Sequence, residues 1–371
     1  MRSFDVVVIG AGAMGSATAW SLARRGRSVL IVDQFEAGHT RGSSHADVRV
    51  FRQAYSDPYY VRLAQRALVD WAELESDCNE VLLDLLGAYD HGPAASIAPF
   101  HAAMLDAGVE LELLRPAEAA ERVPGMRFDD AVLFHAEAGR IFAARTVRVL
   151  QRRTAELGGV ICHDTPARWT AAGDGVDIQL DGTGPLGGTT VHAGVAVLTA
   201  GAWLAPLSAG AFALPPLQLG EEHVVHFTPL DRDVVFPSFI HRLDPFHYGL
   251  HTPDVGLKVG GEHERPVRSA DDRDAEMPAA WIAEAAAYAR RWLPGVDPTP
   301  HVGPACLFTT TPNNDFVLDR VGPIVIGSPC SGHGFKFTPL IGRLLADLAC
   351  GDPAVDDPTV LDPRHRLGAF R

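Results

Sequence analysis

The chain has 371 residues, of which 47% are hydrophobic and 21% are charged, as in an ordinary globular protein with room for two domains. Its formal net charge of −14 excludes a strongly basic surface, so we expect neither nucleic acid nor a membrane as a partner. No apolar run approaches the length of a membrane span. The five cysteines are scattered and have no C-x-x-C spacing, so we expect no disulfide framework, no zinc site and a reducing cytoplasm.

The N-terminal stretch carries the strongest sequence signal. A β-branched run, Val6–Ile9, leads into a G-x-G-x-x-G motif. Gly10 permits a tight turn, Gly12 lets backbone N–H groups approach a pyrophosphate, and Gly15 lets the following helix pack close to the strand. A second apolar run then ends at Asp33, whose carboxylate can accept hydrogen bonds from the hydroxyls of an unphosphorylated ribose. This order of strand, helix, strand and acid predicts a bound dinucleotide, either FAD or NAD.

A polar loop and two arginines follow. Gly42, Ser43 and Ser44 supply backbone donors and a helix cap, which suits a phosphate or the polar edge of a flavin. Arg49 and Arg52 are three residues apart and would share one face if their segment is helical. Two arginines usually form a solvated basic face, but the apolar neighbours of this pair also fit a buried guanidinium.

The middle of the chain contains further predicted helices and strands. Apolar spacing predicts helices at about 60–74, 146–157 and 279–293. The run Val195–Thr199 ends in a turn of small residues, as in a central parallel strand that points at a cofactor. Lys258 lies within the short strand GLKVG, where a lysine is usually at a sheet edge or on the solvent face, with a buried functional role as the alternative.

The C-terminal segment contains a second glycine-rich turn. Val321–Gly327 is predicted to be the last strand, and it leads into SPCSGHGFKF and then a helix at about 339–348. Gly332 and Gly334 therefore precede a helix N-terminus, which suits an anion or an electron-rich group. Lys336 beside this turn is a candidate counter-ion.

Five motifs, in order and spacing, resemble the monomeric sarcosine oxidase and N-methyltryptophan oxidase family of flavoproteins: GAGAMGSATAW, GSSHADVRVFRQAY, GLKVG, GPACLFT and SGHGFKF. The resemblance covers nearly the whole chain and implies FAD rather than NAD, with a mixed α/β fold like that of D-amino acid oxidase. A Rossmann-like FAD-binding domain is expected from residues 1–80, 141–215 and 301–371. An inserted substrate domain with a mixed, largely antiparallel sheet is expected from residues 81–140 and 216–300.

The implied activity is oxidation of a secondary amine, an N-methyl or cyclic amino acid, to an imine, with O2 reduced to hydrogen peroxide by a cytoplasmic monomer. Three other interpretations stay open. A flavin-dependent dehydrogenase would pass its electrons to another acceptor and form no peroxide. An NAD-dependent dehydrogenase would be colourless when purified, and a non-catalytic flavin-binding protein would hold a flavin that no amine reduces.

The resemblance also implies roles for single residues. The family's thioether between a cysteine and the 8α carbon of the flavin falls on Cys306, with Cys330 as its rival and a small buried hydrophobe as the alternative role. Arg52 and Lys336 match the pair that holds the substrate carboxylate. Lys258 matches a lysine associated with oxygen activation, because a cation there would stabilise developing superoxide.

Further matches and departures concern the two sides of the flavin. His45 and Arg49 match residues on the opposite flavin face, and Tyr248 matches a tyrosine of the substrate site. In three places the chain departs from the family pattern: Val48 replaces a threonine, Phe308 replaces a tyrosine, and His263 is displaced by one position from an active-site histidine. These departures leave the flavin chemistry intact and concern which amine is the substrate.

Overall fold

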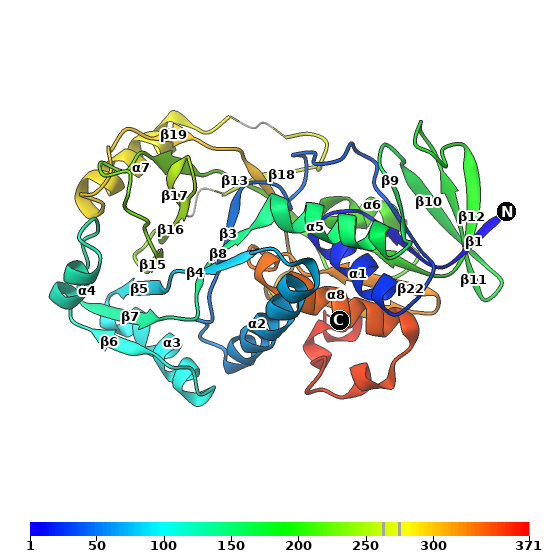
Figure 1. The fold of residues 1–371 in the computed structure, drawn as a ribbon, viewed down its shortest axis with the longest axis horizontal. Coiled ribbons are helices and arrows are strands. Elements are labelled where there is room, and N and C mark those ends of the chain that lie inside the picture. The colour runs from blue at the N-terminus through cyan, green and yellow to red at the C-terminus, as the bar shows by residue number, and fades with distance from the viewer. Residues whose placement is uncertain (209, 262–263, 274–275, 371) are drawn as a thin grey trace.

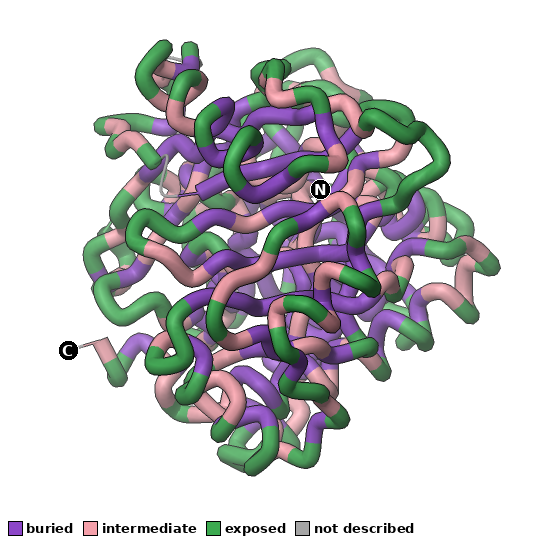
Figure 2. The backbone as a smooth tube through the Cα atoms, turned by 90° about the vertical axis from the view of Figure 1, so that its left-hand side faces the viewer, coloured by how far each residue is buried: buried purple, intermediate pink, exposed green. Residues whose placement is uncertain are grey.

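The computed structural model describes residues 1–208, 210–261, 264–273 and 276–370 and has a mixed α/β architecture, which confirms the predicted fold class (Figure 1). It contains two eight-stranded sheets and two three-stranded sheets. Figure 1 shows the first large sheet in the right half of the molecule and the second in the left half. Buried segments run through the middle of the molecule, and exposed loops surround them (Figure 2).

The first large sheet is built around the N-terminal strands. Its parallel strands run in the order β22, β12, β1, β2 and β9, with the bounds Ile324–Ser328, Thr189–Leu198, Arg2–Ile9, Val29–Val32 and Val160–Cys162. Antiparallel strands complete it: β10 (Ala167–Ala172), β11 (Gly175–Leu180) and β21 (Val317–Val321). The central strands β1 and β2 are buried on both faces, which explains their nearly continuous apolar sequence.

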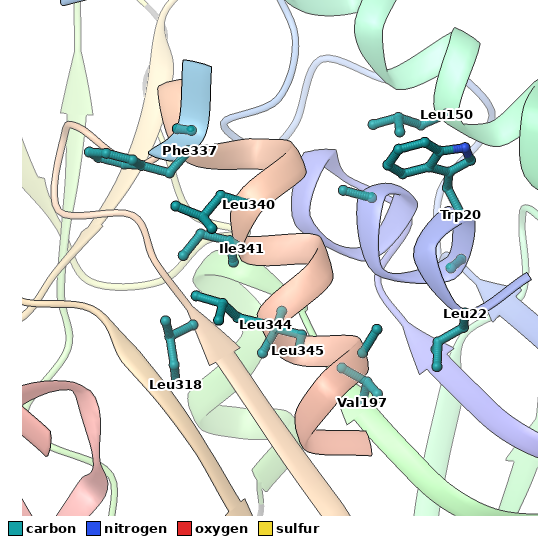
Figure 3. Packing of buried hydrophobic residues seen from close by; sticks show 14 of the residues in the cluster. Trp20, Leu22, Leu150, Val197, Leu318, Phe337, Leu340, Ile341, Leu344 and Leu345 are labelled. Carbon is teal, nitrogen blue, oxygen red and sulfur yellow. The ribbon is translucent and has the colours of Figure 1, made fainter. Parts of the chain in front are cut away.

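Helices cover this sheet and form the main core with it. They are α1 (Ala13–Arg24), α2 (Pro58–Cys78), α5 (Ala143–Glu156) and α8 (Thr338–Cys350). The helices α1 and α8 approach closely, because a Cβ on Gly342 would lie 2.5 Å from the Cβ of Ala17. Figure 3 shows the apolar side chains that fill this core, among them Trp20, Leu150, Leu340, Ile341, Leu344 and Leu345.

The second large sheet combines two distant parts of the chain. Its order is β19, β14, β17, β16, β15, β5, β7 and β6, with the bounds His301–Val302, Val225–Phe227, Gly256–Gly261, His247–Thr252, Ser238–His241, Ala88–Gly92, Ala131–His135 and Glu112–Leu114. Only the pair β15 and β5 is parallel among the paired strands that the structure describes here, so the expected mixed, largely antiparallel sheet is confirmed. Three helices accompany it: α3 (Ala94–Asp106), α4 (Pro116–Arg122) and α7 (Ala279–Trp292).

Two small sheets carry residues of the predicted site. One has β13 (Gln218–Glu222) between β18 (Glu264–Val267) and β20 (Cys306–Thr310), and the other has β8 (Gly139–Phe142) between β3 (Val48–Phe51) and β4 (Leu83–Leu85). The remaining elements are the short helix α6 (Leu204–Ser208) and the 3₁₀ turns Gly201–Trp203, Phe335–Phe337, Pro353–Asp356, Pro363–His365 and Leu367–Phe370.

Most predicted elements are confirmed, and the residues around Arg49 are the main exception. The helices expected at 60–74, 146–157, 279–293 and 339–348 correspond to α2, α5, α7 and α8. The prediction of a helix containing Arg49 is wrong, because the β-branched run there forms strand β3. The predicted domain boundaries stay a prediction. No helix in the described part of the chain is both long and apolar enough to cross a lipid bilayer.

Candidate active site

A cavity of about 1310 Å³ is lined by residues from both large sheets. Fourteen of the predicted site residues line it: Gly10, Gly12, Asp33, Gly42, Ser43, Ser44, His45, Arg49, Arg52, Tyr248, Lys258, Gly332, Gly334 and Lys336. Gly15 and Cys306 do not belong to the lining, whereas Cys330 and Phe308 do. His263 lies outside the residues that the structure describes.

The glycine turn after β1 forms an open backbone cradle. Gly10 has φ +106°, and a Cβ there would lie 2.5 Å from the carbonyl oxygen of Thr199. A Cβ on Gly12 would lie 2.9 Å from the Oγ of Ser44, which accepts a hydrogen bond from the N–H of Ala13 at 2.9 Å. The loop that contains Ser44 is thereby fastened to the first turn of α1. Only glycine leaves the backbone accessible at these two positions.

Asp33 lies at the carboxyl end of β2 and organises the same turn. Its Oδ2 accepts a hydrogen bond from the N–H of Ala11 at 2.7 Å, and its Oδ1 accepts one from Phe35 at 3.0 Å. Burial would raise the pKa of Asp33, but His39 and these two amides outweigh it, and the pKa lies below its usual value. The ionised carboxylate has about four acceptor positions, so it can also accept ribose hydroxyls.

Arg49 in β3 connects the cavity with Cys306. Its Nη2 donates to the Sγ of Cys306 at 3.0 Å and to the carbonyl oxygen of Ser43 at 3.0 Å. Cys306 is the first residue of β20 and is buried. Burial raises the pKa of the thiol of the rival Cys330.

Lys258 lies in a central strand, so the prediction of a sheet edge or a solvent face is wrong for it. Strand β17 runs between β14 and β16, and Lys258 is 4% exposed. Its strand is hydrogen-bonded to a neighbouring strand on each side, and Lys258 belongs to the cavity lining. Burial, and then the charge of Arg49, lower the pKa of Lys258 to about 8.

Glu222 was not predicted, although it is a buried acid at the cavity. The Oη of Tyr248 donates to the Oε1 of Glu222 at 2.8 Å. Burial, and then the charge of Cys306, raise the pKa of Glu222 to about 7. Gly260 lies opposite Tyr248 in the sheet, and a Cβ there would lie 2.6 Å from the tyrosine ring, so the glycine makes room for that ring.

Arg52 and Lys336 meet around the ring of Tyr55. The Nζ of Lys336 donates to the Oη of Tyr55 at 2.9 Å and to the carbonyl oxygen of His333 at 2.8 Å. The guanidinium of Arg52 lies 4.6 Å from the centre of the Tyr55 ring, and its buried Nη1 has no hydrogen-bond partner among the described residues. Burial, and then Arg52, lower the pKa of Lys336 well below its usual range. Two cations with an unused donor form a binding site for an anion such as a carboxylate.

His45 contributes a neutral ring to the lining. It is buried, and burial followed by the charges of Arg49, Arg273 and Lys258 lowers its pKa to about 4. Within the described ranges neither ring nitrogen forms a hydrogen bond of good geometry, and a weaker contact with the backbone of Ala305 acts to raise the pKa. The ring is therefore available to a bound group without adding charge.

Comparison with known proteins identifies the family. Residues 5–348 match the family described as DAO, FAD dependent oxidoreductase. The chain belongs to this family. It is similar to the peroxisomal sarcosine oxidase of Mus musculus, with 30% identity over 99% of this chain and 95% of that protein. It is also 30% identical to the monomeric sarcosine oxidase of Bacillus sp. (strain NS-129), over 93% of this chain and 92% of that one.

A solved structure supports the assignment of this chain to the family of FAD-dependent oxidoreductases. The open form of NikD, described as an unusual amino acid oxidase essential for nikkomycin biosynthesis, has a TM-score of 0.84 and 25% identity, with 98% of each chain covered. The predicted cofactor FAD and the predicted flavoenzyme fold are thereby confirmed, and NAD is excluded as the resident cofactor.

The residues of this FAD-dependent oxidoreductase fit the cofactor. The open glycine cradle suits the pyrophosphate, and Asp33 suits the ribose. The cavity exceeds the roughly 300–1,000 Å³ of a typical ligand site, as a dinucleotide together with a substrate requires. The buried ring of His45 supplies further unused polar atoms.

The sequence does not single out two residues that contact the predicted site, Tyr55 and Glu222, for different reasons. Tyr55 stands three residues after Arg52 within a motif that had been recognised, so its position was an available signal. Glu222 had no such signal, because acids are usually exposed and its place opposite Cys306 depends on the register of β13 and β20.

Proposed function

We propose that this FAD-dependent oxidoreductase oxidises a secondary amine that carries a carboxylate, such as an N-methyl or cyclic amino acid, to an imine, while O2 is reduced to hydrogen peroxide. The observation that carries the proposal is the pair of Arg52 and Lys336 in the cavity, with an unused donor on Arg52. The relatives named sarcosine oxidase support it. When bound, FAD accepts a hydride from the carbon next to the nitrogen.

In this proposal the two cations hold the substrate, and Tyr248 and Glu222 receive its proton. Arg52 and Lys336 bind the carboxylate and orient the C–H bond. The amine must lose its proton before its lone pair can assist hydride departure. Because Tyr248 donates its own hydrogen to Glu222, the lone pairs of its Oη are free to accept a proton from the substrate nitrogen. The proton of the substrate nitrogen moves to the Oη of Tyr248, and at the same time the hydroxyl proton of Tyr248 moves to Glu222.

The first prediction concerns Glu222. Its replacement by Gln should lower kcat/KM at pH 7 by at least about 100-fold, the lower range for general base catalysis. In the unaltered enzyme kcat/KM should fall as the pH drops below about 7, because Glu222 is then protonated and cannot accept a proton. In Glu222→Gln the fall of kcat/KM on the acidic side of the profile should shift to higher pH, where the amine is already neutral in solution.

Steady-state kinetics between pH 5.5 and 9.5 would measure this shift. Glu264→Gln is the matched control, because Glu264 is another carboxylate at the cavity, and it should leave the profile unchanged. An unaltered pH profile in Glu222→Gln would contradict the role of Glu222.

We further propose a covalent thioether between FAD and Cys306, which lies beside the guanidinium of Arg49. Thioether formation removes two electrons and two protons from the thiol and the 8α carbon, and O2 can take them up. After acid precipitation, yellow colour should stay in the pellet of the unaltered protein and of Cys330→Ala. In Cys306→Ala it should move to the supernatant. Visible spectra of both fractions test this, and the reverse pattern would assign the bond to Cys330.

We also propose the discontinuous domains predicted above and a cytoplasmic monomer. The two large sheets, drawn from alternating parts of the chain, support the division. Five free cysteines suit a reducing compartment. Light scattering in solution tests the oligomeric state.

A further inference from the structure

A cluster of two histidines and one aspartate lies on the face of the second sheet that points away from the cavity. His91 in β5 and His241 in β15 are fully buried register partners, and their ring centres are 3.8 Å apart. Ile240 lines the cavity, and because successive strand residues point to opposite faces, His241 points away from it. Asp129, just before β7, completes the cluster. This cluster is therefore separate from the FAD site.

The spacing of the three residues matches metal ligation. The Oδ1 of Asp129 lies 3.1 Å from the Nε2 of His241 and 3.5 Å from the Nδ1 of His91. All three candidate ligand atoms lie within 4.8 Å of one another. Ligands at about 2.0–2.2 Å around a tetrahedral zinc ion lie roughly 3.3–3.6 Å apart. The two rings are stacked with an interplanar angle of 25°, so binding one ion would require the rings to turn apart until a nitrogen of each faces it.

His91 is fully buried, and its nearest charged neighbour is the Oδ1 of Asp129, 3.5 Å from its Nδ1. Neither of its ring nitrogens has a hydrogen-bond partner within the part of the chain described here, although the side chain is fully buried. A buried polar group without a partner is destabilising, and native proteins rarely keep one.

We propose that His91, Asp129 and His241 bind a divalent transition metal ion, zinc in the first place, with water as the fourth ligand. Two imidazoles and one carboxylate form a donor set that zinc uses. The Oη of Tyr288 lies 3.2 Å from the Nδ1 of His241, so this nitrogen can donate to the tyrosine while Nε2 faces the ion. The side chain of Asp129 is 38% exposed, which leaves an entry path and room for the water.

The ion would act as a structural clamp in the second sheet. It would join β5 and β15, the only parallel pair described in that sheet, to the segment before β7. Cysteine spacing in the sequence could not reveal it, because the ligands are not cysteines and come from three separate segments.

Zinc titration of the FAD-loaded enzyme tests the proposal. After dialysis against a chelator, the unaltered protein should bind one equivalent of ZnCl2 in calorimetry and show a higher Tm with zinc than without. Asp129→Asn should weaken binding by at least about 100-fold, since loss of an outer-sphere partner alone costs 10–100-fold. The matched control is His192→Gln, which removes a half-buried His–Asp pair (His192 Nδ1 to Asp177 Oδ1, 2.8 Å) and should leave zinc binding unchanged.

A second measurement detects metal binding without relying on the thermal stability of the protein. Cobalt substituted for zinc should give the visible difference spectrum of a tetrahedral site in the unaltered protein and in His192→Gln, and not in Asp129→Asn. The zinc-free Tm of Asp129→Asn would show that this variant folds. Absence of zinc binding in the unaltered protein, or equal affinity in Asp129→Asn, would overturn the proposal.

Discussion

Replacing Lys258 with methionine is expected to slow the reaction of the reduced enzyme with O2 by at least about 100-fold, the size of effect seen when one charge-stabilising group is removed from an active site. Lys258 belongs to the cavity lining and is buried in a central strand. A fixed cation in a poorly hydrated site stabilises the negative charge that develops on O2. Reduction of the enzyme by the amine should change little, so rapid mixing with oxygenated buffer and anaerobic mixing with substrate separate the two steps.

The pH dependence supplies a further check on Lys258. Burial and Arg49 lower its pKa to about 8, so the lysine loses its charge as the pH rises through that value. Reaction with O2 should therefore slow above about pH 8 in the unaltered enzyme, and this decline should be absent in Lys258→Met. Lys258→Arg, which keeps a cation, should retain most of the rate. Equal slowing of both steps in Lys258→Met would contradict a specific role in oxygen activation.

Replacing Lys336 with methionine is expected to raise KM for an amino-acid substrate by roughly 10- to 150-fold, the loss of one charge-assisted hydrogen bond worth about 1.5–3 kcal/mol. Burial and the nearby Arg52 lower the pKa of Lys336 well below its usual range. A bound carboxylate supplies the missing negative partner and favours the charged lysine. Steady-state kinetics with an N-methyl amino acid, and with the corresponding amine that lacks the carboxylate, measure this effect.

The amine without a carboxylate is the internal control, because its KM should change little. The variant also leaves the Oη of Tyr55 without the donor that Lys336 provides, so a thermal melt should accompany the kinetics. If both substrates lose affinity equally, Lys336 does not recognise the carboxylate.

The nucleotide half of the site can be predicted from the sequence because the residues that define it are close together in the chain. Gly10, Gly12 and Asp33 lie within one strand–helix–strand unit, and their roles follow from backbone geometry in that unit. The burial of Lys258 depends instead on which strands flank β17. One of the two, β14, ends at Phe227, well before β17 begins at Gly256, so it leaves no trace in the residues next to Lys258.

The errors near the substrate have different physical reasons. The spacing of Arg49 and Arg52 fits a helix face, but the β-branched residues around Arg49 and its pairing with β8 make the segment a strand. Glu222 acquires its raised pKa from burial and from Cys306, which is 84 positions away in the chain (306 − 222). Long-range register decides the case of Glu222, whereas the β-branched residues around Arg49 are a local signal for a strand.

The strand order of the first sheet also governs how the protein can be made. Strand β1 needs β12 as its parallel neighbour, and β12 in turn pairs with β22, which begins at Ile324. The turn that carries Lys336 follows later still. The sheet beside the FAD cavity is therefore complete only after most of the chain has been synthesised, and we expect a chain interrupted before residue 324 not to retain the cofactor.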